Sequence, residues 1–228
     1  MSANKIIIYV CLIFLYLGLS KSLSPSELGI SYVTNEESLS ELIRGAPLSV
    51  ILTDTHATGF IIKTHYHKYR VVYGFQTYEE LIVRVSRNFM LQHQKHIGLS
   101  IMHRNSENIA DFTPLPPGSV FIGDRSFGNW QYNKSTKMKE WRFHRAYRYL
   151  PKYLGIEDLD ITEKFYDRIK VAEKNQQAFL GFNDEFGIDG KITKKSFPSF
   201  FAKENKATMD IKEYLKNYFK KNFYTTTR

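Results

Sequence analysis

The 228 residues include 32 Lys or Arg and 23 Asp or Glu, which gives a formal net charge of +9. Hydrophobic residues make up 43% and charged residues 24%, as in globular proteins, so intrinsic disorder is not expected. The length suits one large domain or two small ones, and the positive charge favours anionic partners such as nucleic acid, phospholipid head groups or acidic polymers.

Residues 1–22 have the pattern of a secretory signal peptide. Lys5 precedes a run of fourteen apolar or small residues, 6–19, and the small residues Ser20 and Ser22 fit cleavage after either position. A membrane-spanning helix needs roughly 20 apolar residues, so this run is short for one. We therefore expect an exported protein, periplasmic or secreted, with an uncleaved N-terminal membrane anchor as the alternative.

Cleavage would also change the chemistry of the chain. It would remove Cys11, the single cysteine, together with two lysines and no acid, which lowers the formal net charge to +7. The exported chain would then have neither disulfides nor a thiol nucleophile. Export also argues against cellular nucleic acid as the partner.

Residues 23–115 predict a small N-terminal α/β layer. Thr34 and Glu37 have capping-box spacing, and the helix that follows is expected to end at Gly45. Short apolar runs after turn residues predict strands. These runs are 47–53, 59–63 and 69–75.

A second capping box, Thr77 and Glu80, precedes apolar residues at spacings of three and four. This pattern predicts a helix from Thr77 to about His96. A fourth strand is expected at 99–102, and the prolines of 105–117 indicate a linker or long loop.

Residues 116–155 form an aromatic and basic stretch. It contains both tryptophans, and its eight basic residues face only two acids. We expect antiparallel strands at 119–123, 129–132 and 140–144. In the third strand the alternation predicts Trp141 and Phe143 on one face and Arg142 on the other.

Residues 156–228 predict a C-terminal helical region. A third capping box at Asp160–Glu163 opens one helix, and Thr208 can cap a last, basic helix. That last helix could lie on an anionic membrane or pack on its neighbours. The predicted fold class is α+β: a small mixed sheet with N-terminal helices, an aromatic-rich antiparallel piece and C-terminal helices, with 23–228 as a possible single domain.

The aromatic and basic stretch supplies the candidate binding residues. Aromatic rings stack on sugars, and arginine binds carboxylate or phosphate. The alternative is that the rings form a core under a solvated charged face. The candidate binding residues are Arg125, Trp130, Trp141, Arg142, Arg145 and Arg148.

The histidines supply the candidates for chemistry. His65 and His67 would share one face of a strand, near Asp54 and His56, which makes these four the candidate catalytic residues. Zinc needs three or four converging ligands, and a zinc-bound water could hydrolyse an amide or ester. The candidate metal ligands are His65, His67, His93 and His96.

Residues 188–193 resemble the middle of an EF-hand calcium loop. Asp189 and Gly190 fit its fifth and sixth positions, but the first and twelfth positions would be Glu185 and Ser196, and Gly187 would stand at the third. Because two oxygen ligands are missing, we expect no calcium site here. An Asp-Gly hairpin turn accounts for the same residues and requires no ligands.

The leading hypothesis is an exported, non-enzymatic binding protein of the cell envelope that needs no cofactor. It would recognise an acidic glycan such as peptidoglycan or lipopolysaccharide, or an anionic membrane surface. The alternative is a small periplasmic or secreted hydrolase, assisted by zinc, that acts on an envelope polymer. Exposed tryptophans would favour the first hypothesis, and histidines that converge on a cleft would favour the second.

Overall fold

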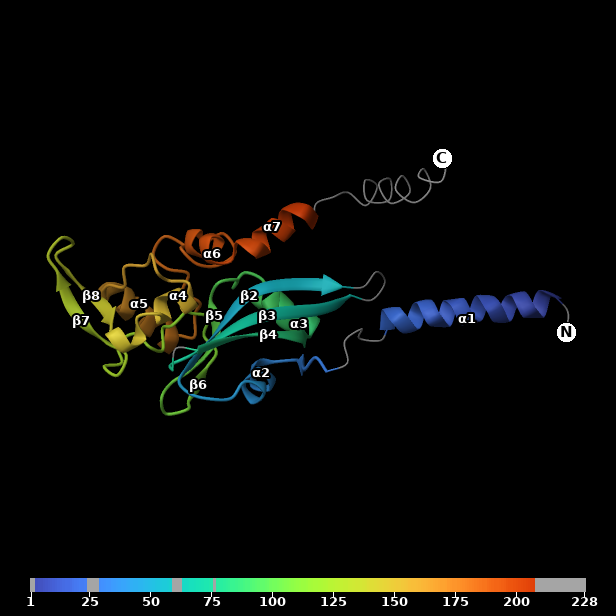
Figure 1. Cartoon of the computed structure of the whole chain (residues 1–228), viewed down its shortest axis with the longest axis horizontal. Coiled ribbons are helices and arrows are strands. Elements are labelled where there is room, and N and C mark those ends of the chain that lie inside the picture. Colours follow the sequence, from blue (N-terminus) through green and yellow to red (C-terminus); the bar gives the residue numbers. More distant parts are fainter. Residues whose placement is uncertain (1–2, 24–28, 59–62, 76, 208–228) are drawn as a thin grey trace.

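The computed structural model describes residues 3–23, 29–58, 63–75 and 77–207. Its centre is a six-stranded mixed sheet, and helices precede and follow it, which makes the fold α+β (Figure 1). Four of the five strand pairings are antiparallel, and the pairing of β1 with β4 is parallel. In sheet order the strands are β1 (Tyr32–Val33), β4 (Thr77–Val85), β3 (Thr64–Tyr73), β2 (Leu48–Thr58), β5 (Ser100–Arg104) and β6 (Ala110–Asp111).

The predicted helix from Thr77 to His96 is wrong in its first half. Residues 77–85 form β4, and only Arg87–His93 form a helix, α3, whose N-cap is Ser86. The buried residues Val83 and Val85 recur every second position, which suits a strand. Strand β3 supplies the hydrogen-bonding partner along the whole of β4, and this pairing outweighs the local helical pattern.

The first predicted helix is confirmed as α2 (Glu36–Leu42), although its cap differs. The N-cap is Asn35, one residue after Thr34. Its side chain accepts a hydrogen bond from the Ser38 backbone N–H, and the Ser38 hydroxyl accepts one from the Asn35 backbone N–H. The loop predicted at 105–117 contains the short strand β6, which pairs with β5.

The sheet has a hydrophobic core on each face, because the side chains of β2 alternate. Leu48 and Val50 pack with Leu39 of α2 and Phe89 of α3. Ile51 packs on the opposite face, where helices α4 (Leu150–Leu154) and α5 (Glu163–Lys174) supply the cover.

The hairpin of β7 (Gly128–Asn133) and β8 (Met138–Phe143) lies beside α5 (Figure 1). It matches two of the three strands predicted for this stretch. The strand predicted at 119–123 is wrong, since these residues form turns; Gly118, just before them, and Gly123 have positive φ angles of 78° and 86°. Two short helices follow later in the chain, α6 (Lys191–Ser196) and α7 (Pro198–Ala207).

The apolar run near the N-terminus lies in helix α1 (Ala3–Leu23). Its described large apolar side chains, from Ile6 to Leu17, are exposed. In the described part of the chain, no helix combines the length and apolarity that crossing a membrane requires. The strand predicted at 59–63 and the helix predicted after Thr208 fall almost wholly outside the described residues.

Candidate functional site

The two tryptophans pack against each other, and only one of them, Trp130, is partly exposed. Trp130 and Trp141 are paired across the hairpin with ring centroids 5.2 Å apart, and Trp130 also contacts Tyr166 of α5. Trp141 is only 4% exposed and belongs to the core on this face of the sheet, while Trp130 is half-buried against it. Trp141 is therefore a core residue and has no open face for a sugar.

Three of the four candidate arginines are exposed and lie in segments that contact each other. These are Arg125, Arg145 and Arg148. His144 Nε2 lies 3.0 Å from the backbone carbonyl oxygen of Arg125, so the turn that contains Arg125 contacts the segment that begins at His144. Arg145 and Arg148 are three apart around a single 3₁₀ turn (Arg145–Tyr147), where residues at this spacing eclipse. In the part of the chain that the structure describes, none of the three forms an ion pair.

Arg142, the fourth candidate arginine, is already neutralised. Its Nη2 donates to Glu140 Oε2 at 2.6 Å. Glu140 also accepts hydrogen bonds from Thr136 and Asn133, and these bonds, led by that from Thr136, lower the pKa of its carboxyl group. Arg142 therefore fixes the hairpin and is a weaker candidate for ligand binding.

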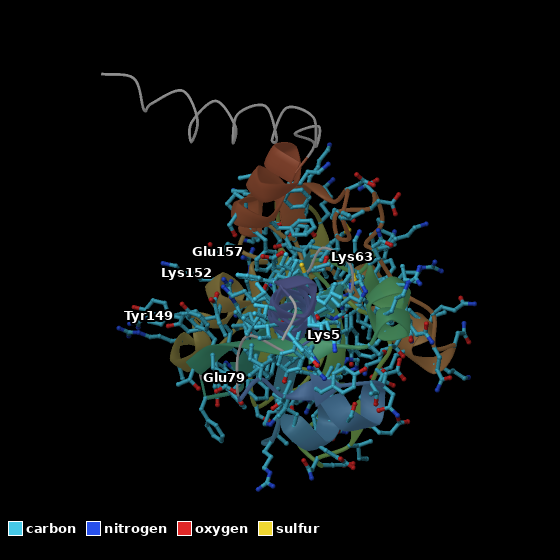
Figure 2. The ribbon with its side chains drawn as sticks, turned by 90° about the vertical axis from the view of Figure 1, so that its right-hand side faces the viewer. Lys5, Lys63, Glu79, Tyr149, Lys152 and Glu157 are labelled. Carbon is cyan, nitrogen blue, oxygen red and sulfur yellow. The ribbon has the colours of Figure 1, made fainter. Side chains whose placement is uncertain are left out.

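Tyrosines continue the surface that Arg145 and Arg148 begin. The Arg148 guanidinium lies 4.6 Å from the Tyr149 ring centroid and donates to its hydroxyl at 3.0 Å. Tyr153 links Tyr149 to Tyr78 of β4, with ring centroids 6.4 and 5.1 Å away. Tyr149 and Lys152 point outward on the same side of the molecule (Figure 2). We name this the arginine–tyrosine surface, and it comprises Arg125, Arg145, Arg148, Tyr149, Lys152, Tyr153 and Tyr78.

Strand pairing separates the four candidate catalytic residues. His56 pairs with Tyr66 in the register of β2 and β3, so His56 and Asp54 lie on one face of the sheet. His65 and His67 lie on the other. The four side chains therefore do not converge on one site.

His67 is a buried core residue. It is fully buried, its Nδ1 lies 2.8 Å from the Tyr69 hydroxyl, and its ring packs against Phe89 of α3. Burial, followed by the nearby His93, lowers its pKa to about 3, so the ring is neutral at physiological pH. Its Nε2 has no hydrogen-bond partner among the described residues.

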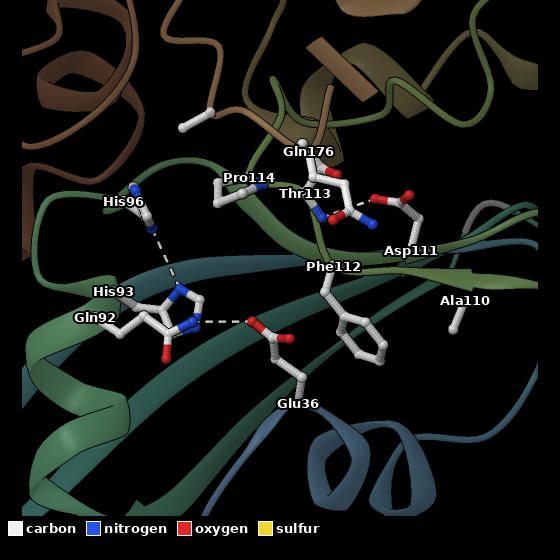
Figure 3. A pocket seen from close by; sticks show the side chains of 11 residues that line it. Glu36, Gln92, His93, His96, Ala110, Asp111, Phe112, Thr113, Pro114 and Gln176 are labelled. Carbon is white, nitrogen blue, oxygen red and sulfur yellow. Dashed lines mark hydrogen bonds between the residues drawn. The ribbon is translucent and has the colours of Figure 1, made fainter. Parts of the chain in front are cut away.

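His93 and His96 lie together in a polar pocket of about 410 Å³ (Figure 3). Their Nδ1 atoms are 3.2 Å apart. Burial lowers both pKa values, that of His93 to about 4, so neither ring carries charge at neutral pH. His93 Nε2 is buried without a partner in the described structure.

Carboxylates complete the wall of this pocket. Glu36 comes from the first turn of α2, accepts from Gln92 Nε2 at 3.0 Å, and has a pKa raised mainly by burial. Asp111 of β6 lines the opposite part of the pocket (Figure 3). The pocket therefore combines neutral histidines with two acids.

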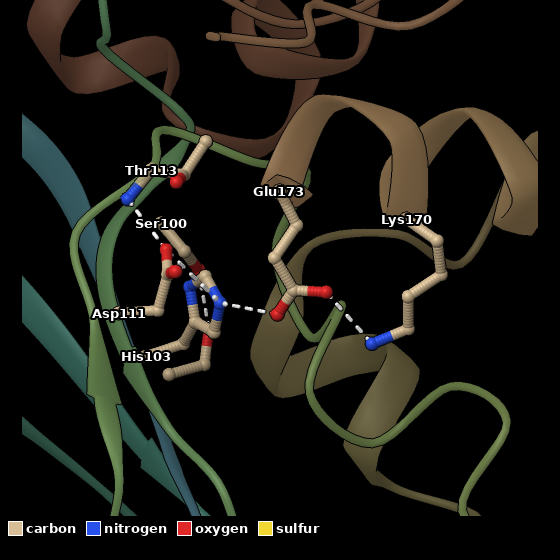
Figure 4. Close-up of polar contacts among 7 residues, drawn as sticks. Ser100, His103, Asp111, Thr113, Lys170 and Glu173 are labelled. Carbon is tan, nitrogen blue, oxygen red and sulfur yellow. Dashed lines mark hydrogen bonds and ion pairs between the residues drawn. The ribbon is translucent and has the colours of Figure 1, made fainter. Parts of the chain in front are cut away.

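Asp111 also faces a second cluster, with His103 of β5 and Glu173 of α5 (Figure 4). His103 Nε2 lies 3.7 Å from Asp111 Oδ1 and 3.5 Å from Glu173 Oε1. Among the described residues, this is the one group of three His, Cys, Asp or Glu whose possible ligand atoms all lie within 4.8 Å of one another. We name it the His103 cluster.

The surroundings of the His103 cluster hold its two carboxylates in place. Lys170, one turn earlier on α5, donates to Glu173 Oε2 at 2.8 Å. The Thr113 backbone N–H donates to Asp111 Oδ1 at 2.7 Å. The hydrogen bond from His103, and then that from Lys170, lower the Glu173 pKa to about 2 against the effect of burial.

Residues 188–193, which resemble part of an EF-hand loop, form neither a calcium loop nor a hairpin. Gly190 is the N-cap of α6, so residues 191–196 are helical, and the expected Asp-Gly hairpin turn is wrong. The Asp189 side chain is 94% exposed, while the Glu185 carboxylate accepts from the backbone and side chain of Asn183.

Sequence reasoning missed the His103 cluster because its members are 8 and 62 residues apart in the chain. The pairing of β5 with β6 sets His103 opposite Asp111, and α5 must pack over the sheet edge before Glu173 can reach them.

Comparison with family models, with curated proteins and with solved structures finds no match to this chain.

Proposed function

We propose that this chain is an exported envelope protein that binds an acidic glycan through the arginine–tyrosine surface. The observation that carries this proposal is the group of exposed arginines Arg125, Arg145 and Arg148, which have no acidic partner among the described residues and lie near the exposed ring of Tyr149. The tyrosines take the role that the sequence suggested for Trp130 and Trp141.

The chemistry of the surface fits an acidic sugar polymer. A guanidinium group binds a carboxylate or phosphate with two parallel hydrogen bonds, and its charge is fixed at all physiological pH values. A tyrosine ring offers an apolar face and a hydroxyl, which suits the mixed surface of a sugar. A formal net charge of +9, or +7 after cleavage of residues 1–22, adds long-range attraction for any polyanion.

The apolar run at 6–19, part of helix α1, supports the export half of the proposal. In a periplasm or outside the cell, acidic glycans are abundant polyanions and cellular nucleic acid is not at hand. An anionic membrane surface would offer similar charge but no stack of sugar rings for Tyr149, so the glycan is the partner we propose.

The test is binding to labelled polygalacturonate, an acidic polysaccharide, followed by fluorescence anisotropy. We expect binding that weakens as sodium chloride rises from about 50 to about 300 mM, because counterions screen exposed charges. The double variant Arg145→Ala, Arg148→Ala should bind at least tenfold more weakly. Neutral dextran should not bind.

Arg168→Ala is the matched control, because Arg168 is an exposed arginine on α5 outside this surface. It should retain the wild-type affinity. Equal weakening in the control and the double variant would show non-specific attraction and contradict the proposal. Binding to vesicles with anionic lipid, without binding to the polysaccharide, would replace the glycan by a membrane.

A further inference from the structure

The distances inside the His103 cluster are unusual for direct hydrogen bonds. His103 Nε2 has two carboxylate oxygens at 3.5 and 3.7 Å, whereas a charged hydrogen bond of this kind has a length of about 2.7–2.9 Å. Two acids thus surround one ring nitrogen; only Glu173 lies within hydrogen-bonding distance of it, and that bond is long. Close packing would ordinarily bring such groups together.

The same distances suit three ligands around one ion. Zinc binds histidine nitrogen and carboxylate oxygen at about 2.0–2.2 Å, and tetrahedral ligands at that radius are about 3.4 Å apart. The separations of 3.5 and 3.7 Å from His103 Nε2 are close to this value, and the two carboxylate oxygens lie within 4.8 Å of each other. One imidazole with two carboxylates is also a ligand set that divalent transition metals accept.

We propose that His103, Asp111 and Glu173 bind a single divalent transition-metal ion, with zinc as the first candidate. This site is independent of the arginine–tyrosine surface. Its ligands are also oriented by neighbours, since Lys170 occupies Glu173 Oε2 and leaves Oε1 turned toward His103 (Figure 4). The Thr113 N–H fixes the Asp111 carboxylate in the same way.

The site is open on the side of the polar pocket. Asp111 and Thr113 belong to the lining of that pocket, and the Asp111 and Glu173 side chains are 31% and 29% exposed, against 4% for His103. Solvent therefore reaches both carboxylates, which leaves a fourth ligand position open to water or a small molecule. Three protein ligands with one open position are typical of catalytic zinc sites, whereas structural sites are closed by four.

The pocket itself points to a ligand through His93. This residue is 1% exposed and lines the pocket, and its Nε2 has no hydrogen-bond partner among the described atoms. A buried polar atom without a partner costs free energy unless a ligand or ordered water satisfies it.

The second ring nitrogen of His103, Nδ1, also bears on how tightly zinc should bind. Nδ1 is buried and has no hydrogen-bond partner in the described structure. The partner that usually orients a metal-binding histidine changes affinity by about 10- to 100-fold. We therefore expect zinc to bind more weakly, by about this factor, than at a site with the same ligands whose histidine has such a partner.

The experiment is calorimetric titration of the EDTA-treated, dialysed protein with zinc sulfate. The wild-type protein should bind one equivalent of zinc, with a higher melting temperature in its presence. Glu173→Gln and Asp111→Asn keep the size of each side chain but remove a negative ligand, and each should weaken binding at least tenfold. Circular dichroism checks that both variants are folded.

Two control variants make the result specific. Asp167→Asn removes an exposed carboxylate from the same helix and should keep the wild-type affinity. His96→Ala tests the His93–His96 pair as the place where zinc binds and should also keep it. The proposal is overturned if folded wild-type protein binds no zinc, if Glu173→Gln retains wild-type affinity, or if His96→Ala alone abolishes binding.

Discussion

Arg104 joins the end of α2 to the edge of the sheet through a single side chain. It is 7% exposed, and its guanidinium donates to the carbonyls of Ser40, Ile43 and Gly45 and to the Ser40 hydroxyl, at 2.8–3.0 Å. The last carbonyls of a helix have no partner within the helix. Arg104 therefore supplies donors to Ser40 in the last turn of α2, to the C-cap Ile43 and to Gly45 beyond it.

We predict that Arg104→Lys lowers the free energy of unfolding by about 2–3 kcal/mol. Lysine keeps the positive charge but cannot reproduce the fork of donors, so at least two buried carbonyls lose their partner. Urea denaturation followed by circular dichroism measures the change. Arg168→Lys on the surface of α5 should change it by less than about 0.5 kcal/mol, and an equal effect of both variants would contradict this role.

At the scale of the element, the packing of α3 on β3 depends on neutral histidines. His67 of β3 and His93 of α3 are both buried, and Phe89 contacts both rings. Burial lowers their pKa values from 6.5 to about 3 and about 4. The unfolded chain therefore takes up protons at these two residues at a higher pH than the folded chain does.

We predict that stability falls as the pH drops below about 6.5. The contribution of each histidine is fully present above that pH and decreases until the folded-state pKa values are reached. At pH 5.5, one unit below the ordinary pKa, each histidine should cost about 1.4 kcal/mol. Protonation of Glu173, whose pKa is about 2, occurs at lower pH and does not contribute to this loss of stability.

Urea denaturation in EDTA at several pH values measures this dependence. His93→Gln removes one of the two groups and should reduce the loss between pH 7 and pH 5.5. His144→Gln, at an exposed position, is the matched control. A profile that is flat over this range would contradict the burial of uncharged rings.

At the scale of the whole molecule, one sheet separates two cores. Both tryptophans lie on the side of α5, while Leu39 of α2 is fully buried on the opposite face. The two faces share the residues of β2, which alternate between them. Loss of either core should therefore unfold the sheet and, with it, the other core.

We predict that Leu39→Ala lowers the free energy of unfolding by about 3 kcal/mol through the cavity it leaves. The transition seen by tryptophan fluorescence, which reports the distant face, should move as far as the transition seen by circular dichroism. Two separate transitions, with the tryptophan signal unmoved, would show that the faces unfold as independent units.

The sequence predicted those elements whose signals are local. Capping signals near the starts of α2 and α5, the apolar runs of β2 and β5, and the alternation in β8 all act within a few residues, although the observed N-caps are Asn35 and Thr162 rather than the predicted Thr34 and Asp160. The same local reasoning failed for β4, where helical spacing and a capping-box pattern were both present. Pairing with β3 decided that segment, because hydrogen bonds between strands depend on residues far away in the chain.

The sequence by itself determined the class of fold, the positive charge and the candidate arginines, since composition and short spacings are enough for these. Only the tertiary structure decided that Trp141 is buried, that His56 and His67 lie on opposite faces, and that His103 meets Asp111 and Glu173. The physical reason is that a site of this kind is a matter of distance between side chains. Those distances are set by strand register and helix packing, which bring together residues that no local pattern connects.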